Sequence, residues 1–407
     1  MKNGFSSSAA RGKSSPMPFK LIDLFAGCGG FSLGFEQVGS GSSGEKKAFE
    51  PVWANDSGEA AAETYRANFA APCDSREITR VLEGKRSFPS ADVVVGGPPC
   101  QGFSLLGKNR SEGAGGNGDP RNELWRPFME VVERSGAQVF VMENVPRLLG
   151  SPQHSLITGK AAELGFRTAS RVLCAADYGV PQTRTRAFVL GWRGRGELGR
   201  RVFPPRPTHS DPRGGGGVQL DAFREGRGSS EGEGARGAPP SRWRTVRDAV
   251  GDLPPPVGTQ VRREEEGPLD LHFGRNPTEK SEKRYRAIPE EGMNRIDLEE
   301  RAPEITPDCW KRKNRGGTDL FGRLWWDRPA FTIRTEFFKP EKGRFLHPSQ
   351  HRAITHREAA RFQSFPDSFA FKGSKRQIAR QIGNAVPPLL ARRVGEAVRD
   401  LLLSKKR

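Results

Sequence analysis

The chain has 407 residues and a formal net charge of +18, from 66 Lys and Arg against 48 Asp and Glu. That length suffices for two ordinary domains, the basic excess favours a polyanionic partner, and no apolar run could cross a bilayer. Five cysteines without a Cys-x-x-Cys pair argue against a disulfide scaffold and a structural zinc site, so we expect no metal.

The chain begins with a Ser-rich stretch and continues with alternating strand and helix patterns. Residues 1–18 lack the apolar centre of a secretory signal, so we expect a flexible leader and a cytoplasmic, nucleoid-associated protein. Strand patterns cover 19–25, 51–56, 91–95, 137–142, 167–173 and 187–192; helical patterns cover 31–38, 59–68 and 125–134. Residues 19–192 therefore predict an α/β domain with a Rossmann-like, mostly parallel sheet and helices on both faces.

The composition changes after residue 192. Residues 193–240 form a low-complexity basic insert rich in Gly, Arg, Ser and Pro. Residues 243–253 predict a helix, 262–313 look irregular and highly charged, and order returns near 320–336. We therefore expect a smaller irregular domain over 193–345 and a distinct C-terminal segment over 346–407.

Residues 23–30, Asp-Leu-Phe-Ala-Gly-Cys-Gly-Gly, lie where a predicted strand turns into a helix. Glycines in such a turn let the backbone approach a ligand closely. Asp56 ends the next strand, where its carboxylate could accept hydrogen bonds from a ribose diol. The glycine spacing differs from the dinucleotide-binding pattern, and a tight turn in an unrelated α/β protein is the alternative interpretation.

The strand pattern before Gly96-Gly97-Pro98-Pro99 presents Cys100 at its end. The prolines stiffen the turn, and the carboxyl end of a parallel sheet is where α/β proteins place their sites. A lone cysteine is commonly a small buried hydrophobe, but this rigid lead-in favours a nucleophile. The polar, Gly-rich residues 105–119 that follow suit a mobile lid.

Five motifs together resemble the ordered signatures of the cytosine-5 DNA methyltransferase family. They are residues 23–30, 97–104, 143–145, 182–186 and 381–388, and the resemblance runs through nearly all of 21–394, weakly in the middle. It implies S-adenosylmethionine as cofactor, duplex DNA as substrate and a monomer, and it leaves room for a separately encoded cognate restriction endonuclease. It also implies target recognition within 193–326, ahead of the familial Arg-Pro-x-x-Thr-Ile pattern at 328–333, and a return of the C-terminal segment to the large domain.

The resemblance assigns site residues by position. The catalytic candidates are Cys100, Glu143, Arg184 and Arg186; the cofactor candidates are Phe25, Ala26, Gly27, Gly29, Gly30, Asp56, Glu77, Pro98 and Asn384; the DNA candidates are Gln101 and Ser104. Asp74 is the rival of Glu77 for the adenine amino group. A glutamate at the end of a buried strand is costly unless paired, so a structural salt bridge is the alternative for Glu143, and an exposed basic edge strand is the alternative for the arginines.

Three other functions compete with DNA cytosine-5 methylation. A tRNA cytosine-5 methyltransferase of the same family would keep the fold, but the long basic middle region favours DNA. An amino-group methyltransferase needs an Asn/Asp-Pro-Pro-aromatic turn, which residues 98–100 do not supply. A non-catalytic DNA-binding module would not need Cys100, Glu143 and Arg186 together.

Overall fold

A computed structural model describes residues 17–39, 47–84, 88–99, 120–194, 202–212, 239–265, 267–311 and 319–404. Structural statements below concern these residues. Cys100, Gln101, Ser104, the expected lid at 105–119, most of the expected leader and most of the low-complexity insert lie outside them.

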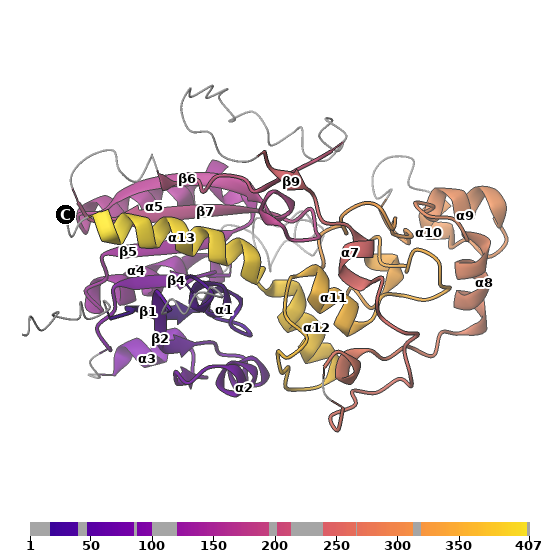
Figure 1. Ribbon diagram of the computed structural model, residues 1–407, viewed down its shortest axis with the longest axis horizontal. Helices are drawn as coiled ribbons and strands as arrows, with labels where there is room; N and C mark the ends of the chain where they lie inside the picture. The colour runs from indigo at the N-terminus through magenta and orange to yellow at the C-terminus, as the bar shows by residue number, and fades with distance from the viewer. Residues whose placement is uncertain are drawn as a thin grey trace, which may run out of the picture.

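A seven-stranded sheet forms the centre of the larger lobe, in the order β3-β2-β1-β4-β5-β7-β6 (Figure 1). Strand β7 runs antiparallel to both β5 and β6, and the other pairings are parallel. The predicted α/β class with a mostly parallel sheet is therefore confirmed. The strands are β1 (Phe19–Leu24), β2 (Phe49–Asn55), β3 (Cys73–Asp74), β4 (Val93–Gly96), β5 (Val139–Asn144), β6 (Arg167–Cys174) and β7 (Thr185–Trp192).

Apolar residues on the inner strands alternate between two helical layers. Val93 and Val95 face the layer of α1 (Gly30–Glu36) and α13 (Pro388–Ser404). Val94 faces the opposite layer, which contains α3 (Ile78–Glu83), α4 (Trp125–Arg134) and α5 (Pro152–Glu163). Successive strand residues point to opposite faces, so a continuous valine run serves a sheet covered on both sides.

Helix α13 brings the C-terminal part of the chain back onto the sheet layer beside α1 (Figure 1). The two helices approach closely at Gly34, where an added Cβ would lie 2.4 Å from the carbonyl oxygen of Pro388 and 2.5 Å from Cβ of Ala391. Phe31 and Phe35 of α1 share an apolar cluster with the inner face of α13. The small residue at 34 therefore permits this helix pair.

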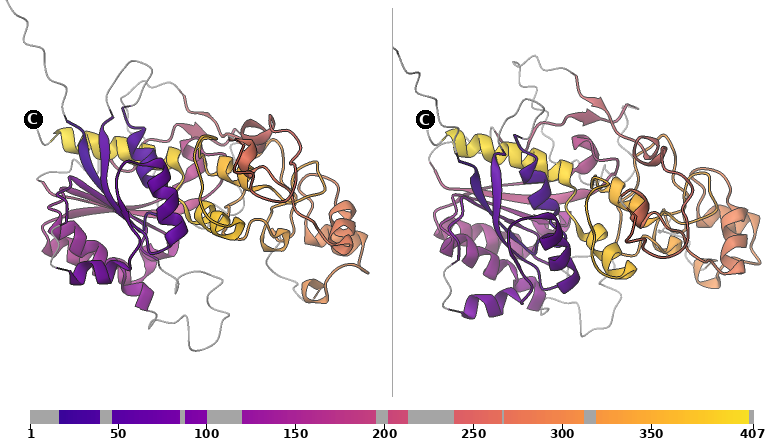
Figure 2. Two further views of the ribbon diagram at one scale, coloured as in Figure 1. Left: turned by 90° about the horizontal axis from the view of Figure 1, so that it is seen from below. Right: turned by 60° about the horizontal axis from the view of Figure 1, so that its bottom comes forward.

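The second lobe comprises the described residues of 239–384 and lies beside the carboxyl ends of the parallel strands (Figure 2). Its helices are short and joined by long loops. They are α7 (Val246–Val250), α8 (Glu279–Ala287), α9 (Arg295–Arg301), α10 (Asp308–Lys311), α11 (His356–Phe362) and α12 (Lys375–Asn384); β8 (His209–Ser210) pairs with β9 (Ser241–Arg242). Single 3-10 turns are η2 (Pro120–Glu123), η3 (Pro146–Gly150), η4 (Ala175–Tyr178), η6 (Leu269–Leu271) and η7 (Pro340–Lys342).

The expectation that residues 262–313 are irregular is wrong for α8, α9 and α10. Helix α8 is almost wholly polar and buries only Tyr285, so it shows little apolar periodicity. Two local polar interactions support it, the Thr278 cap and a Glu279–Lys283 ion pair, and Tyr285 anchors it in an apolar cluster. An amphipathic pattern could not have revealed it.

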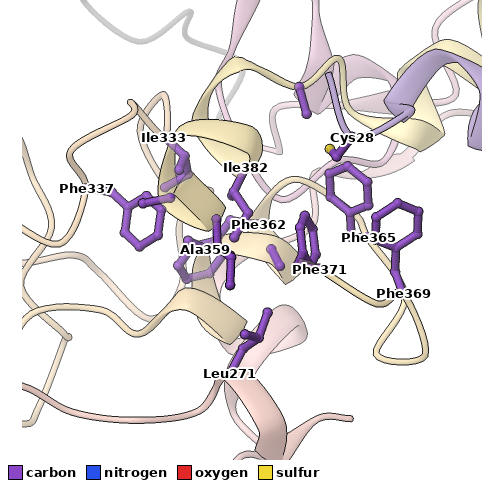
Figure 3. Packing of buried hydrophobic residues seen from close by; sticks show 14 of the residues in the cluster. Cys28, Leu271, Ile333, Phe337, Ala359, Phe362, Phe365, Phe369, Phe371 and Ile382 are labelled. Carbon is purple, nitrogen blue, oxygen red and sulfur yellow. The ribbon is translucent and has the colours of Figure 1, made fainter. Parts of the chain in front are cut away.

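The two lobes share one apolar core (Figure 3). Phe365, Phe369 and Phe371, which follow α11, pack against one another and toward Cys28 of the larger lobe. Phe69, which caps α2 (Glu59–Asn68), contacts Phe369 with ring centroids 6.3 Å apart. Helices α11 and α12 are therefore anchored to the edge of the sheet domain. No helix in the described ranges is long and apolar enough to span a membrane.

Candidate active site

The turn from β1 into α1 has an unusual backbone at three positions. Phe25, Gly27 and Gly29 all have positive φ, at 54°, 56° and 94°. The Ala26 N–H donates to the Asn55 carbonyl oxygen at 3.0 Å, which fixes the turn to the end of β2. An added Cβ on Gly27 would meet nothing within 4 Å, so the backbone there borders open space. The predicted close approach of a ligand fits Gly27.

Gly29 and Gly30 are tightly packed. An added Cβ on Gly30 would lie 2.2 Å from the Val386 carbonyl oxygen, and one on Gly29 would lie 2.4 Å from the ring of Phe69. These glycines bring α1 against α2 and against the link between α12 and α13. Asn384 is exposed at the end of α12, two residues before Val386, whose backbone packs against Gly30.

Asp56 follows β2 and holds this edge together. Its carboxylate accepts hydrogen bonds from the Gly27 N–H at 2.8 Å and the Gly58 N–H at 2.9 Å. Burial raises the pKa of Asp56, while these two hydrogen bonds lower it. Each carboxylate oxygen retains a second lone pair, so Asp56 can still accept from a ligand hydroxyl.

Of the two rival acids, Asp74, the last residue of β3, is already paired. Its carboxylate binds the Arg76 guanidinium at 2.5 Å and accepts from the Arg76 N–H at 3.0 Å. Glu77 is exposed at the start of α3 and close enough to Asp56 for its charge to raise that pKa. Asn55 ties the intervening loop by donating to the Asp74 carbonyl oxygen at 2.8 Å. The geometry favours Glu77 as the acid available to a ligand.

The residues leading to Cys100 are held against the end of β5. The side-chain amide of Asn144 donates to the Pro98 carbonyl oxygen at 2.9 Å. An added Cβ on Gly97 would lie 3.0 Å from Oε2 of Glu143, and one on Gly96 would lie 2.2 Å from the Leu24 carbonyl oxygen. The Gly-Gly-Pro-Pro segment thus runs directly beside the Glu143 carboxyl group.

Glu143 and the two arginines form a buried charged group. Glu143 is 8% exposed, and its Oε1 lies 3.0 Å from Nε of Arg186. Arg184 is 2% exposed, and burial lowers its pKa well below the usual value. Burial raises the pKa of Glu143, whereas the charges of Arg186 and Arg184 oppose that rise. The exposed-edge alternative for these arginines is wrong, because β7 lies between β5 and β6.

Two buried glutamines, whose roles the sequence did not suggest, support Arg184. Gln182 accepts from the Ile333 N–H at 2.8 Å and donates to Oε1 of Gln363 at 2.9 Å. The Ile333 carbonyl oxygen accepts from Nη1 of Arg184 at 3.2 Å. Gln363 in turn donates to the Ala385 carbonyl oxygen at 3.4 Å. A continuous series of hydrogen bonds therefore joins Arg184 to the residue after Asn384.

Three of the four described cysteines do not suit nucleophilic chemistry. Cys28, Cys73 and Cys174 are buried, and burial raises the pKa of Cys28 far above its ordinary value and that of Cys73 to about 12. A protonated thiol is a poor nucleophile. Cys309 is exposed on α10, in the second lobe. No cluster of three or more metal-ligating side chains occurs in the described part of the chain.

Known proteins share both the sequence and the fold of this chain. The family model for C-5 cytosine-specific DNA methylase matches residues 19–400. Type II methyltransferase M1.HphI of Haemophilus parahaemolyticus is 33% identical, covering 94% of this chain and 87% of its own. Type II methyltransferase M.AgeI of Thalassovita gelatinovora is 31% identical, covering 93% and 99%.

A solved structure described as a DNA modification methyltransferase encoded within an E. coli prophage aligns with a TM-score of 0.62 at 23% identity. The alignment covers 95% of this chain and 99% of that one, and it supports the fold. The family match extends over both lobes and every motif described above. The chain is therefore an enzyme that belongs to the C-5 cytosine-specific DNA methylase family.

Proposed function

We propose that this enzyme methylates carbon 5 of a cytosine within a specific duplex DNA sequence, through a covalent bond between Cys100 and carbon 6. The observation that carries the proposal is the position of the Glu143–Arg186 pair directly beside the segment that leads into Cys100. A stacked base cannot reach such a buried acid, so the target cytosine must flip out of the duplex. Gln101 and Ser104 are proposed to contact the DNA around it.

The proposed chemistry begins with the thiolate of Cys100, which bonds to carbon 6. The electrons of the carbon 5–carbon 6 double bond move toward carbon 5, and N3 of the ring gains negative charge. Glu143 offsets that charge by sharing its proton with N3, because burial raises its pKa. Arg186 holds Glu143 in place, and Arg184 adds positive charge to the same pocket. After carbon 5 is methylated, loss of its proton and of the bond to Cys100 restores the ring.

We propose S-adenosylmethionine as the cofactor, held at the carboxyl ends of β1 and β2. When bound, it supplies an electrophilic methyl group on a sulfonium centre. The open backbone face of Gly27 and the spare lone pairs of Asp56 fit a nucleoside at this edge. Phe25, Ala26, Glu77, Pro98 and Asn384 complete the proposed site.

Trapping on DNA that contains 5-fluorocytosine tests the covalent step, because fluorine at carbon 5 prevents release of the enzyme. We expect a stable complex for the parent enzyme and none for Cys100→Ala. Cys309→Ala is the matched control, since that exposed thiol lies on α10 and should leave trapping unchanged. Trapping by Cys100→Ala at the parent rate would contradict the proposal.

The names of the relatives support duplex DNA and a restriction–modification context, since both are type II methyltransferases. We propose target recognition within residues 193–326, with a monomer acting on DNA. Labelled cofactor incubated with duplex DNA or with tRNA separates the two substrate classes, and methylation of tRNA alone would exclude the proposed substrate. Bisulfite sequencing of the methylated DNA would then identify the recognition sequence.

A further inference from the structure

A second site lies in the second lobe, where a cavity of about 390 Å³ opens at the N-terminal end of α12. Three aromatic rings form its wall. The ring of His356 lies 4.7 Å from that of Phe273 and 6.1 Å from that of Phe338, centroid to centroid, and is nearly parallel to the latter, at 11°. The volume falls within the usual range for small-molecule sites, and aromatic walls favour flat rings.

The cavity is strongly cationic. Arg275, Lys375 and Arg376 line it, and none of its described lining residues carries a carboxylate. Lys375 donates to the Thr259 carbonyl oxygen at 2.9 Å and lies 5.9 Å from the centre of the Phe273 ring. Arg275 lies 5.8 Å from the Phe338 ring. Three cations beside an aromatic wall favour a ligand that carries both a flat ring and an anionic group.

His356 adds a specific requirement. Its side chain is 5% exposed, and its Nε2 atom lies 2.9 Å from the Lys375 carbonyl oxygen, so Nε2 carries the proton and donates it. Burial lowers the pKa of His356 to about 4, which leaves the ring neutral at pH 7. Nδ1 is then an acceptor, and no described residue donates to it. A ligand that fills the cavity should offer a hydrogen-bond donor at this point.

We propose that this cavity binds a nucleoside phosphate whose base carries an exocyclic amine. The base lies against the rings of Phe273 and Phe338, the amine donates to Nδ1 of His356, and the phosphate meets Arg275 and Arg376. The cavity is separate from the proposed cofactor site, because Lys375 and Asn384 lie at opposite ends of α12, about 14 Å apart along a helix that rises 1.5 Å per residue.

Calorimetric titration of the full chain with AMP tests this site. Saturating S-adenosylhomocysteine is present throughout, so that AMP cannot be counted at the cofactor site. We expect one AMP to bind, with adenosine and inorganic phosphate each about tenfold weaker, because each lacks either the charge-assisted bonds or the stacking. Purine riboside monophosphate, which lacks the amine, should bind about fivefold more weakly than AMP.

Two arginines on α12 provide a matched pair of variants. Arg376 lines the cavity and Arg380 does not, although both are exposed and four residues apart. We expect Arg376→Gln to weaken AMP binding about tenfold and Arg380→Gln to leave it unchanged. Absence of AMP binding, equal effects of the two variants, or phosphate binding as tightly as AMP would overturn the proposal. A 5′-phosphorylated duplex that binds in an Arg376-dependent way while AMP does not would assign the cavity to DNA and overturn it also.

Discussion

Gln182 and Gln363, which are 181 residues apart in the chain, share a buried hydrogen bond of 2.9 Å between their side-chain amides. Each is fully buried. Gln182 also fixes Ile333, whose carbonyl oxygen holds Arg184, and Gln363 also binds the carbonyl oxygens of Ile382 and Ala385. The proposed catalytic arginine and the proposed cofactor segment are therefore positioned by the same pair of side chains.

We expect Gln363→Leu both to lower kcat and to raise KM for the cofactor. The substitution removes the hydrogen bonds that link Gln182, and through it Arg184, to the segment that ends α12. It should also lower the free energy of unfolding by about 1–3 kcal/mol, since Gln182 loses a buried partner. Steady-state kinetics and urea denaturation measure these effects.

Gln381→Leu is the control. Gln381 is a similarly buried glutamine that donates to the Ala60 and Lys372 carbonyl oxygens, and within the described residues it shares no hydrogen bond with Gln182. We expect a comparable loss of stability with kcat closer to the parent value. An equal fall in kcat for both variants would show that Gln363 acts only through stability.

Gly27→Ala should weaken cofactor binding with little further effect on the fold. Both Gly27 and Gly136 have positive φ and open space where a Cβ would stand, so alanine at either position costs about 1 kcal/mol of stability. Only Gly27 borders the proposed cofactor site. Calorimetric titration with S-adenosylhomocysteine should show weaker binding for Gly27→Ala than for the parent enzyme. Gly136→Ala is the control and should bind with the parent affinity. Similar affinities for both variants would argue against a cofactor beside Gly27.

Glu143→Gln should reduce the single-turnover rate of methyl transfer roughly 10²–10⁴-fold, the usual loss when a general acid is removed.

In Arg186→Gln the pKa of Glu143 should rise further, because the nearest positive charge is lost. The residual activity should then persist to higher pH on the alkaline side of the profile. Arg171→Lys, at an exposed position of β6, is the control and should have the pH profile of the parent enzyme. If the alkaline limb of the profile does not shift in Arg186→Gln, the group that titrates there is not Glu143.

Glu358 should make the second lobe sensitive to acid. Burial raises the pKa of Glu358. Arg352, whose Nη2 lies 2.6 Å from Oε1 of Glu358, and the hydrogen bond from the Thr355 N–H lower this pKa by more, to about 2 from the ordinary value of 4.5. Because the folded pKa is the lower one, the ionised carboxylate stabilises the fold above pH 4.5, and this contribution of about 3 kcal/mol is lost as the pH falls toward 2.

Urea denaturation measures this dependence between about pH 5 and pH 2, because this window covers both the ordinary and the folded-state pKa of Glu358. Glu358→Gln should remove most of the slope in that window, whereas Glu133→Gln, at an exposed position of α4, should retain it. Parent-like acid sensitivity in Glu358→Gln would assign the effect to other carboxyl groups.

The periodicity of apolar residues predicted most elements of the sheet domain, but it could not predict elements that are very short or almost wholly polar. Helices α2 and α4 have the predicted bounds, and α4 has a clear apolar face that buries Trp125, Phe128 and Val132. Strand β3 has only two residues, too few for any alternation, and α8 has almost no apolar face. The motif order indicated which residues would meet at the candidate site, but not how Asp74 and Glu77 differ. That difference depends on the ion pair with Arg76, which only the folded geometry reveals.

The packing of α13 on α1 has a consequence for synthesis of the enzyme. Until residues 388–404 have left the ribosome, the apolar side chains of Phe31 and Phe35 lack their cover, and the turn at Gly30 lacks the Val386 backbone against which it packs. The nascent chain therefore cannot complete the packing beside the proposed cofactor site before residues 388–404 have emerged. Methylation activity should begin only after residues 388–404 have been synthesised and have packed on α1.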